Sequence, residues 1–223
     1  MPRQRIRIRF AKFGRLKFIG HIDLLRTLEA LFRRAKLPLA MSCGFHPKVR
    51  MSFPCALALG FESNDEVLEL EMEESAEPVN LPLLLADLNH QSLEGLTFLS
   101  ARLLKEGEKK ACIASSTFQI SVPSELRNQV AERVESFLAE TSLTLSKSNG
   151  KPVDVRAAVR QMSLSETGEW IVELQAQAGP AAGIKEVLTA LHLEKELFVT
   201  LFPRRIRCRL ENEAESDGYI GCL

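Results

Sequence analysis

The segment Ser42-Cys43-Gly44-Phe45-His46-Pro47-Lys48-Val49-Arg50-Met51-Ser52-Phe53 decides how the first part of the chain folds. It joins a helix with a basic end to a strand that begins near Met51. Gly44 reaches positive φ without steric cost, and Pro47 biases His46 toward an extended backbone. The segment is therefore predicted to be a turn that places an aromatic ring, a histidine and two cations at the start of a strand.

A helix is predicted immediately before this turn, over about 21–36. Its apolar residues recur at helical spacing: Leu24, Leu25, Leu28, Leu31, Phe32 and Ala35. Asp23 lies in the first turn, and Arg33, Arg34 and Lys36 lie in the last, which suits the helix dipole. Pro38 is expected to end the helix.

Three strands are predicted around this helix. Residues 5–10 alternate cation and hydrophobe, so the strand has one buried face and one exposed face that carries a row of arginines. Residues 51–59 form a second strand, which Gly60 ends and Pro54 makes irregular or places at an edge. Residues 66–73 alternate cleanly and form a strand with an acidic outer face.

The order of the predicted elements indicates the fold. A helix over 81–88 and a strand over 96–104 complete the order strand, helix, strand, strand, helix, strand, which is the ferredoxin-like unit. The order then repeats as a strand at 118–122, a helix at 125–140, a hairpin at 153–164 and 169–177, a helix at 184–193 and a strand at 198–210.

The predicted fold is therefore α+β, with two tandem ferredoxin-like halves and antiparallel sheets. The N-terminal domain is expected over 1–110, the C-terminal domain over 111–210 and an acidic flexible tail over 211–223. The linker between the domains is expected over 105–114.

The composition is that of an ordinary globular protein: 45% of the 223 residues are hydrophobic and 26% are charged. No apolar run approaches the ~20 residues of a membrane span, and the first residues lack the apolar core of a signal peptide. The five cysteines are scattered without a Cys-x-x-Cys pair, which favours a reduced cytoplasmic setting over disulfides or structural zinc. Walker and dinucleotide-binding signatures are absent, and no cofactor or metal is expected.

The net charge of zero conceals an asymmetry. Residues 1–60 hold thirteen lysines and arginines against two acids, a balance of +11, whereas residues 61–110 have a balance of −8. A basic segment beside an acidic one suggests that one face meets a polyanion.

Arginines on the first strand are predicted to grip RNA phosphates, together with the basic connection that follows. A four-stranded ferredoxin-like sheet leaves one face without helices, and RNA-binding members of this fold use that face. The alternative is a solvated edge whose charge deters aggregation.

The turn offers a second RNA contact. Phe45 can stack on a base, His46 can form a hydrogen bond, and Lys48 or Arg50 can hold a phosphate. The alternative is a tight turn in which Phe45 belongs to the core and His46 satisfies a backbone carbonyl. The full set of candidate RNA-binding residues is Arg5, Arg7, Arg9, Lys12, Arg15, Lys17, Arg26, Arg33, Arg34, Phe45, His46, Lys48 and Arg50.

Two histidines raise the alternative of catalysis. His21 and His46 together would form an acid–base pair for a metal-independent endoribonuclease. The structural alternative is that His21 and Asp23 cap the first helix. Cys43 and Cys55 are expected to be bystander thiols rather than metal ligands.

Several runs carry a family resemblance: KFGRLKFIGHIDLLR at 12–26, RRAKLPL at 33–39, SCGFHP at 42–47 and MSF at 51–53. They resemble the bacterial "radical SAM-linked protein" family, whose members occur beside radical SAM enzymes or fused to them. The resemblance is specific over about 12–60 and looser to about 210. Pro54 and Cys55 depart from the small residues usual there, and the chain lacks the Cys-x3-Cys-x2-Cys motif of the radical enzyme itself.

The resemblance implies a radical SAM enzyme as the partner. Together with the predicted RNA contacts, it leads us to expect an RNA-binding accessory protein that works with this enzyme in tRNA or rRNA modification or processing. Its tandem layout is also similar to that of the CRISPR repeat-processing ribonucleases, an analogy at the level of the fold. A further alternative is a protein-docking module for the radical SAM partner, with the acidic strand at 66–73 as its contact.

Overall fold

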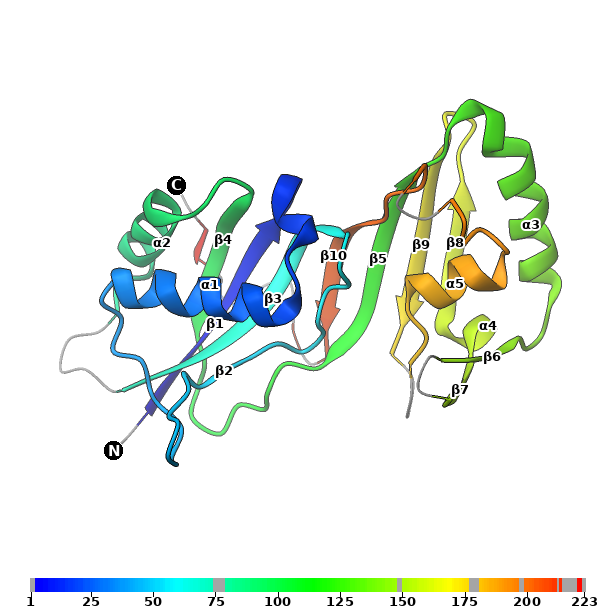
Figure 1. Cartoon of the computed structure of the whole chain (residues 1–223). Helices are drawn as coiled ribbons and strands as arrows, with labels where there is room; N and C mark the ends of the chain where they lie inside the picture. Colours follow the sequence, from blue (N-terminus) through cyan, green and yellow to red (C-terminus); the bar gives the residue numbers. More distant parts are fainter. Residues whose placement is uncertain are drawn as a thin grey trace. The chain divides into compact units, whose positions relative to one another are not determined.

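The computed structural model describes residues 3–73, 79–147, 150–176, 181–196, 199–211, 213 and 220–221. The chain divides into two compact units (Figure 1). Unit 1 comprises Met1–Cys112 with Leu210–Leu223, and unit 2 comprises Ile113–Arg209. Each unit combines helices with antiparallel strands, so the protein is α+β. Among the described residues, none of the helices is long and apolar enough to cross a membrane.

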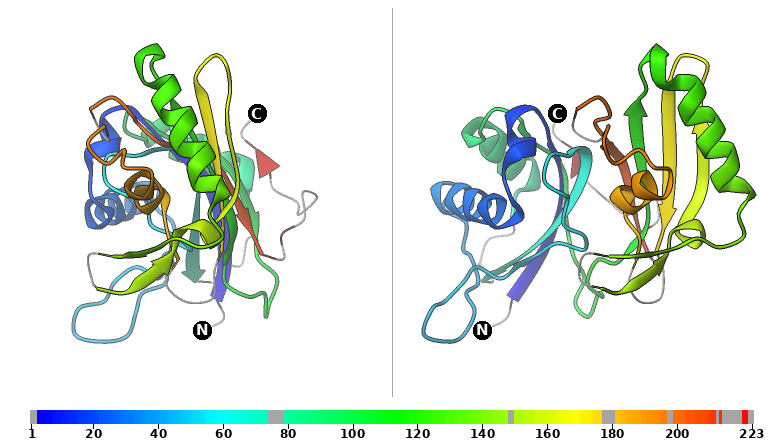
Figure 2. Two further views of the ribbon diagram at one scale, coloured as in Figure 1. Left: turned by 90° about the vertical axis from the view of Figure 1, so that its right-hand side faces the viewer. Right: turned by 45° about the vertical axis from the view of Figure 1, so that its right-hand side comes forward.

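Unit 1 is built on four antiparallel strands with a short fifth at one edge. Its elements are β1 (Arg3–Lys12), η1 (Gly14–Phe18), α1 (His21–Arg34), β2 (Met51–Ser52), β3 (Glu62–Glu73), α2 (Leu81–Gln91), β4 (Leu96–Leu103) and β11 (Ile220–Gly221). The strand order is β11-β4-β1-β3, and β2 pairs with β3. Both α1 and α2 cover the same face of this sheet (Figures 1 and 2).

The core of unit 1 follows from the alternation along β1. Ile6, Ile8 and Phe10 are fully buried beneath α1 and α2. The register places Ile6 opposite Leu70 and Ile8 opposite Leu68, which are also fully buried. Burial of each such side chain is worth about 1.5–3 kcal/mol. The cations between these positions must therefore point to the other face of the sheet.

The strand predicted over 51–59 is largely wrong. Only Met51 and Ser52 pair with β3, and the chain then bends at Pro54 and turns at Gly60, whose φ is 86°. Pro54 has no N–H to donate to a ladder, so pairing stops before it. The other predicted elements of unit 1 are present, with ends shifted by a few residues.

The sheet strands of unit 2 follow the order β10-β5-β9-β8, and β6 and β7 form a separate two-stranded sheet. Its elements are β5 (Ile113–Ser121), η2 (Ser124–Leu126), α3 (Arg127–Ala139), β6 (Thr144–Ser146), β7 (Pro152–Asp154), α4 (Val155–Ala158), β8 (Val159–Leu164), β9 (Glu169–Gln175), α5 (Ile184–Ala190) and β10 (Arg204–Leu210). α3 and α5 lie on one side of this sheet (Figure 2). Both helices have buried residues, and Trp170 and Val172 of β9 are fully buried.

Two predicted strands of unit 2 differ from the structure. The run 153–164 contains the one-turn helix α4, because the Asp154 side chain accepts a hydrogen bond from the backbone N–H of Ala157 and caps it. The closing strand begins at Arg204 rather than at residue 198, which lies outside the described residues, as does residue 177.

Candidate functional site

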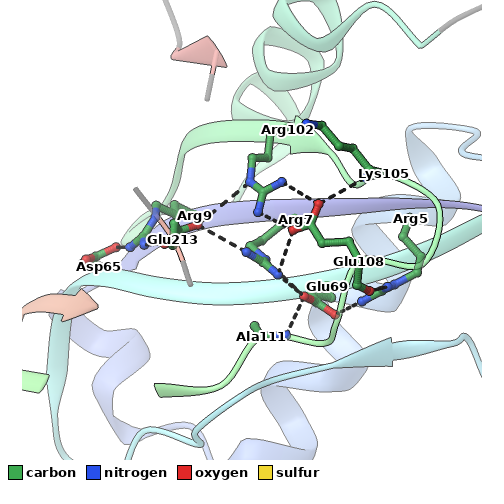
Figure 3. Close-up of polar contacts among 10 residues, drawn as sticks. All are labelled: Arg5, Arg7, Arg9, Asp65, Glu69, Arg102, Lys105, Glu108, Ala111 and Glu213. Atoms are coloured by element: carbon green, nitrogen blue, oxygen red, sulfur yellow. Dashed lines mark hydrogen bonds and ion pairs between the residues drawn. The ribbon is translucent and has the colours of Figure 1, made fainter. Parts of the chain in front are cut away.

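The arginines of β1 lie on the helix-free face of unit 1, as their alternation predicts, but they do not form a solvent-exposed row. Only 3% of the Arg7 surface is exposed, and the side chains of Arg5 and Arg9 are 22% and 17% exposed. With Arg102 of β4 they form what we call the arginine cluster (Figure 3). The prediction of an exposed arginine face is therefore wrong.

Four carboxylates neutralise this cluster. Glu69 accepts hydrogen bonds from Arg5 at 2.8 Å and from Arg7 Nε and Nη2 at 3.0 and 2.8 Å. The remaining partners bind as follows: Asp65 binds Arg9 at 2.5 Å, Glu213 binds Arg9 at 2.5 Å and Arg7 at 3.3 Å, and Glu108 binds Arg102 at 2.6 and 3.0 Å. The cluster is thus held by the protein's own acids.

The carboxylates of this network are stabilised in their charged form. Burial raises the pKa of Glu69, but hydrogen bonds from Arg5, Arg7 and the Ala111 N–H outweigh it, so the pKa is lowered. Hydrogen bonds from Arg102 lower the pKa of Glu108 to about 2 despite its desolvation. Both groups remain ionised throughout the physiological range.

The acidic residues of the strand at 66–73, the predicted docking surface, are also buried or paired with cations of the same chain. Glu66 is 2% exposed and Glu69 4% exposed. Glu71 accepts from Arg50 at 2.5 Å and pairs with Arg3 at 3.5 Å. These acids form intramolecular ion pairs or lie in the interior, so the prediction of an exposed acidic face is not met by Glu66 and Glu69.

Lys12 is not a surface cation. Its side chain is fully buried near the end of β1, and burial lowers its pKa, while the charge of Glu66 partly opposes that effect. A phosphate in solvent cannot reach this ammonium in the folded state. Lys12 is thus the buried last residue of β1 and not the first residue of the basic connection that was predicted after this strand.

The predicted turn forms a projecting loop over residues 42–48, which we call the Phe45 loop. Its base is closed by two hydrogen bonds, from the Ser42 N–H to the Lys48 carbonyl at 2.8 Å and from the Lys48 N–H to Ser42 Oγ at 2.9 Å. Gly44 adopts φ 129°, as its role in the turn requires. Residues 43–48 are all exposed, and Phe45 is fully exposed. The alternative in which Phe45 belongs to the core is wrong.

The remaining candidate cations lie elsewhere on unit 1. Arg15, Arg26, Arg33 and Arg34 are exposed, and Lys17 is half-buried. Arg26 lies 3.5 Å from Asp23, Arg33 lies 2.8 Å from Glu29, and Arg34 donates to the Gln91 carbonyl at 3.2 Å. Lys17 lies 4.0 Å from Glu62 and 5.2 Å from the centroid of the Phe18 ring. The partners of Arg33 and Arg34 are thus on the helices rather than on the Phe45 loop.

The two histidines have different surroundings. The His21 ring packs edge-on against Phe53, with 5.3 Å between ring centroids, at the first residue of α1. His46 lies on the exposed Phe45 loop. No contact of the described residues joins the two rings, so the structure adds no support for an acid–base pair. Within the described residues, no group of three His, Cys, Asp or Glu side chains is placed to hold a metal.

Sequence reasoning missed the residues that cover the arginine cluster. Glu108 lies in the predicted linker, and Glu213 lies in the segment expected to be a flexible tail. The part of that segment described by the structure belongs to unit 1, where Glu213 contacts Arg7 and Arg9 and β11 pairs with β4. The charge balance between 1–60 and 61–110 was the available signal, but it does not specify which pairs form.

Comparison with known proteins identifies a family. The family described as "Uncharacterized protein conserved in bacteria (DUF2344)" matches residues 5–185, which include most of β1, the Phe45 loop and most of unit 2. No curated protein matches the chain.

Proposed function

The chain belongs to the bacterial DUF2344 family, and we propose that it is a cytoplasmic RNA-binding accessory protein that binds single-stranded RNA through the Phe45 loop. We further propose that both units are ferredoxin-like. The strand orders β4-β1-β3-β2 and β10-β5-β9-β8, each with helices on one side, support that assignment.

The exposure of Phe45 is the observation that carries this proposal. The ring is fully exposed at the tip of a loop whose base is fixed by the Ser42 and Lys48 hydrogen bonds. It contributes no burial to the fold, whereas stacking a base on it is worth ~1–3 kcal/mol. Because these hydrogen bonds fix the two ends of the loop, binding loses less conformational entropy than it would with a free loop. His46 and Lys48, exposed on either side of Pro47, supply a hydrogen-bonding group and a cation beside the ring.

The exposed cations of unit 1 support the same reading. Arg15, Arg26, Lys36 and Lys48 are all exposed on a segment whose balance is +11. Such charges supply affinity for phosphates without selecting a sequence. The Phe45 loop would then add the contact with a base.

The radical SAM enzyme is the partner we propose, with tRNA or rRNA modification or processing as the process. This part of the proposal depends on the resemblance over 12–60, a span that includes the Phe45 loop. An accessory role follows from it because the radical chemistry would belong to the partner.

Substitution of Phe45 tests the proposal. Phe45→Ala is expected to weaken binding of a single-stranded RNA oligomer by ~1–3 kcal/mol and to leave the melting temperature nearly unchanged. Leu83→Ala is the matched control, because Leu83 is also an exposed apolar side chain of unit 1, at 66% exposure on α2. Titration by fluorescence anisotropy and thermal melting measure the two quantities. Equal RNA affinity of wild type and Phe45→Ala would refute the role of the loop.

The recovered RNA distinguishes a binding protein from a nuclease. We expect the oligomer to remain intact after long incubation with the protein in chelator. Cleavage that His46→Ala abolishes would instead support the endoribonuclease alternative, because a metal-independent enzyme needs a general acid or base.

A further inference from the structure

We propose that the arginine cluster is a second phosphate-binding site, which the carboxylates of Glu108 and Glu213 cover in this structure. The proposal rests on the proposed RNA binding and names another surface for the RNA backbone. Its ligand is a chain of phosphates.

The carboxylates of the network are of two kinds. Asp65 and Glu69 belong to β3 and are part of the sheet that carries the arginines. Glu108 follows β4 in the connection to unit 2, and Glu213 follows β10, so both reach the cluster from outside the sheet. Neither Glu108 nor Glu213 belongs to β1, β3, β4 or the hydrophobic core of unit 1.

Glu108 and Glu213 occupy the positions that phosphate oxygens would take. Glu108 accepts from both Nη1 and Nη2 of Arg102, at 3.0 and 2.6 Å, which is the fork-to-fork geometry that guanidinium offers to carboxylate and phosphate alike. Glu213 bridges Arg7 and Arg9 at 3.3 and 2.5 Å. Two phosphates in place of these two carboxylates would preserve both the charge and the donor geometry.

A cavity of about 430 Å³ opens beside the cluster and gives a ligand access to it. It is lined by Arg7, Glu108 and the neighbouring Lys109 and Lys110, and also by Cys112 and Glu211. Both lysines are exposed and line the same cavity as Arg7. A smaller cleft of about 160 Å³ on the same unit is lined by the cations Arg5, Arg50 and Lys110, by Met51 and Ser52, and by the carboxylates of Glu69 and Glu71. Lys110 thus borders both openings.

The contacts of Arg7 would allow a phosphate to replace Glu108 and Glu213. Its shortest ion pair, 2.8 Å, is with Glu69 of the sheet, whereas Glu108 and Glu213 lie at 3.5 and 3.3 Å. An arriving phosphate would therefore displace the two longer contacts and leave the Arg7–Glu69 pair intact. Because that pair remains, the exchange does not leave a buried charge without a partner.

The double variant Glu108→Gln/Glu213→Gln tests the proposal. It removes both covering charges, conserves side-chain shape and leaves Asp65 and Glu69 in place. Two probes are compared: inorganic polyphosphate, which has no bases, and a single-stranded uridine oligomer, which has them. The expected result is tighter binding of both probes, with a log–log salt slope for the oligomer that is steeper by about 1.4, since each contact on a single strand contributes about 0.7.

The control is Glu132→Gln/Glu173→Gln, which removes two carboxylates from unit 2 and changes the net charge equally. A gain shared by the control would be an effect of net charge and would overturn the proposal. A folded Glu108→Gln/Glu213→Gln with wild-type affinity for both probes would also overturn it. If the double variant does not fold, Glu108→Gln alone is measured with the same probes, with an expected slope change of about 0.7 for the oligomer, and an unchanged slope would count against the site.

Phe45→Ala separates this proposal from the proposed function. Polyphosphate has no base to stack, so its binding to the double variant is expected to be unaffected by Phe45→Ala. Loss of oligomer binding with retained polyphosphate binding would support both sites. Oligomer affinity that is insensitive to Phe45→Ala would refute the loop, whereas the gain in polyphosphate binding would still support the covered cluster.

Discussion

At the scale of single residues, Arg7 and Arg33 are both arginines paired with glutamate at 2.8 Å, yet their environments differ. The Arg7 side chain and its partner Glu69 are each 4% exposed, whereas Arg33 and Glu29 are 53% and 33% exposed. Removal of one partner from a buried pair typically costs ~3–5 kcal/mol, because the other charge remains buried. An exposed i,i+4 pair contributes only ~0.3–0.5 kcal/mol.

We therefore expect Arg7→Met to lower the free energy of unfolding by several times more than Arg33→Met. Urea denaturation followed by circular dichroism measures both variants. Similar losses for the two substitutions would show that the arginine cluster adds no more stability than a surface ion pair.

The same residues show what sequence can and cannot predict. The alternation Arg5, Arg7, Arg9 correctly assigns these side chains to the face opposite the core, because side-chain direction in a strand is a local property. Their exposure depends on Glu108 and Glu213, which are distant in sequence and which no local period specifies. The exposure of Phe45 was also undetermined by the sequence. A turn is compatible with either a buried or an exposed ring, and the outcome depends on tertiary packing.

At the scale of elements, two glycines with positive φ have different roles. Gly44, at φ 129°, lies in the Phe45 loop, where an added Cβ would meet nothing within 4 Å. Gly95, at φ 89°, precedes β4, where an added Cβ would lie 2.4 Å from the Phe13 carbonyl oxygen. The Phe13 N–H also donates to the Gly95 carbonyl at 2.9 Å, so this approach holds the start of η1 against β4.

Gly95→Ala is expected to destabilise unit 1 by more than ~2 kcal/mol, since it adds a backbone clash to the conformational strain. Gly44→Ala bears only the strain of its φ, ~1–3 kcal/mol, and is expected to weaken RNA binding by displacing the Phe45 ring. Thermal melting together with RNA titration distinguishes the two. A larger loss of melting temperature in Gly44→Ala would contradict this assignment.

Most elements were predictable because their hydrophobic periods are strong, as in α1 and β3. The exceptions are positions where a local signal outweighs the apolar run. Pro54 cuts the strand after Met51 and Ser52, and Asp154 caps a single helical turn inside the run 153–164. Such capping depends on one side-chain hydrogen bond, which a hydrophobic pattern does not reveal.

At the scale of the whole molecule, the two units are expected to respond differently to acid. The pKa of Glu69 is lowered, and that of Glu108 is lowered from 4.5 to about 2, and both belong to unit 1. A carboxylate whose pKa is depressed by folding stabilises the folded state above its unfolded pKa, and this contribution is lost as pH falls toward the folded pKa. Unit 1 should therefore lose stability progressively from about pH 5 to about pH 2.

Trp170 makes the difference measurable, because it is the single tryptophan of the chain and is fully buried in unit 2. On acid titration we expect circular dichroism to report loss of unit 1 before Trp170 fluorescence changes. The pKa of Asp154 in unit 2 is also lowered, and the largest cause is the hydrogen bond from the Ala157 N–H. Asp154 is partly exposed, so we expect it to contribute less to the acid dependence of stability.

Glu108→Gln should reduce the acid dependence of unit 1, because it removes a group worth about 3 kcal/mol between its unfolded and folded pKa values. The variant should be less stable than wild type at pH 7 and approach it as the pH falls to about 2, where Glu108 of the wild type is protonated in the unfolded state and about half protonated in the folded state. Urea denaturation at several pH values measures this convergence. Parallel curves for the two proteins over that range would show that Glu108 does not carry the acid sensitivity of unit 1.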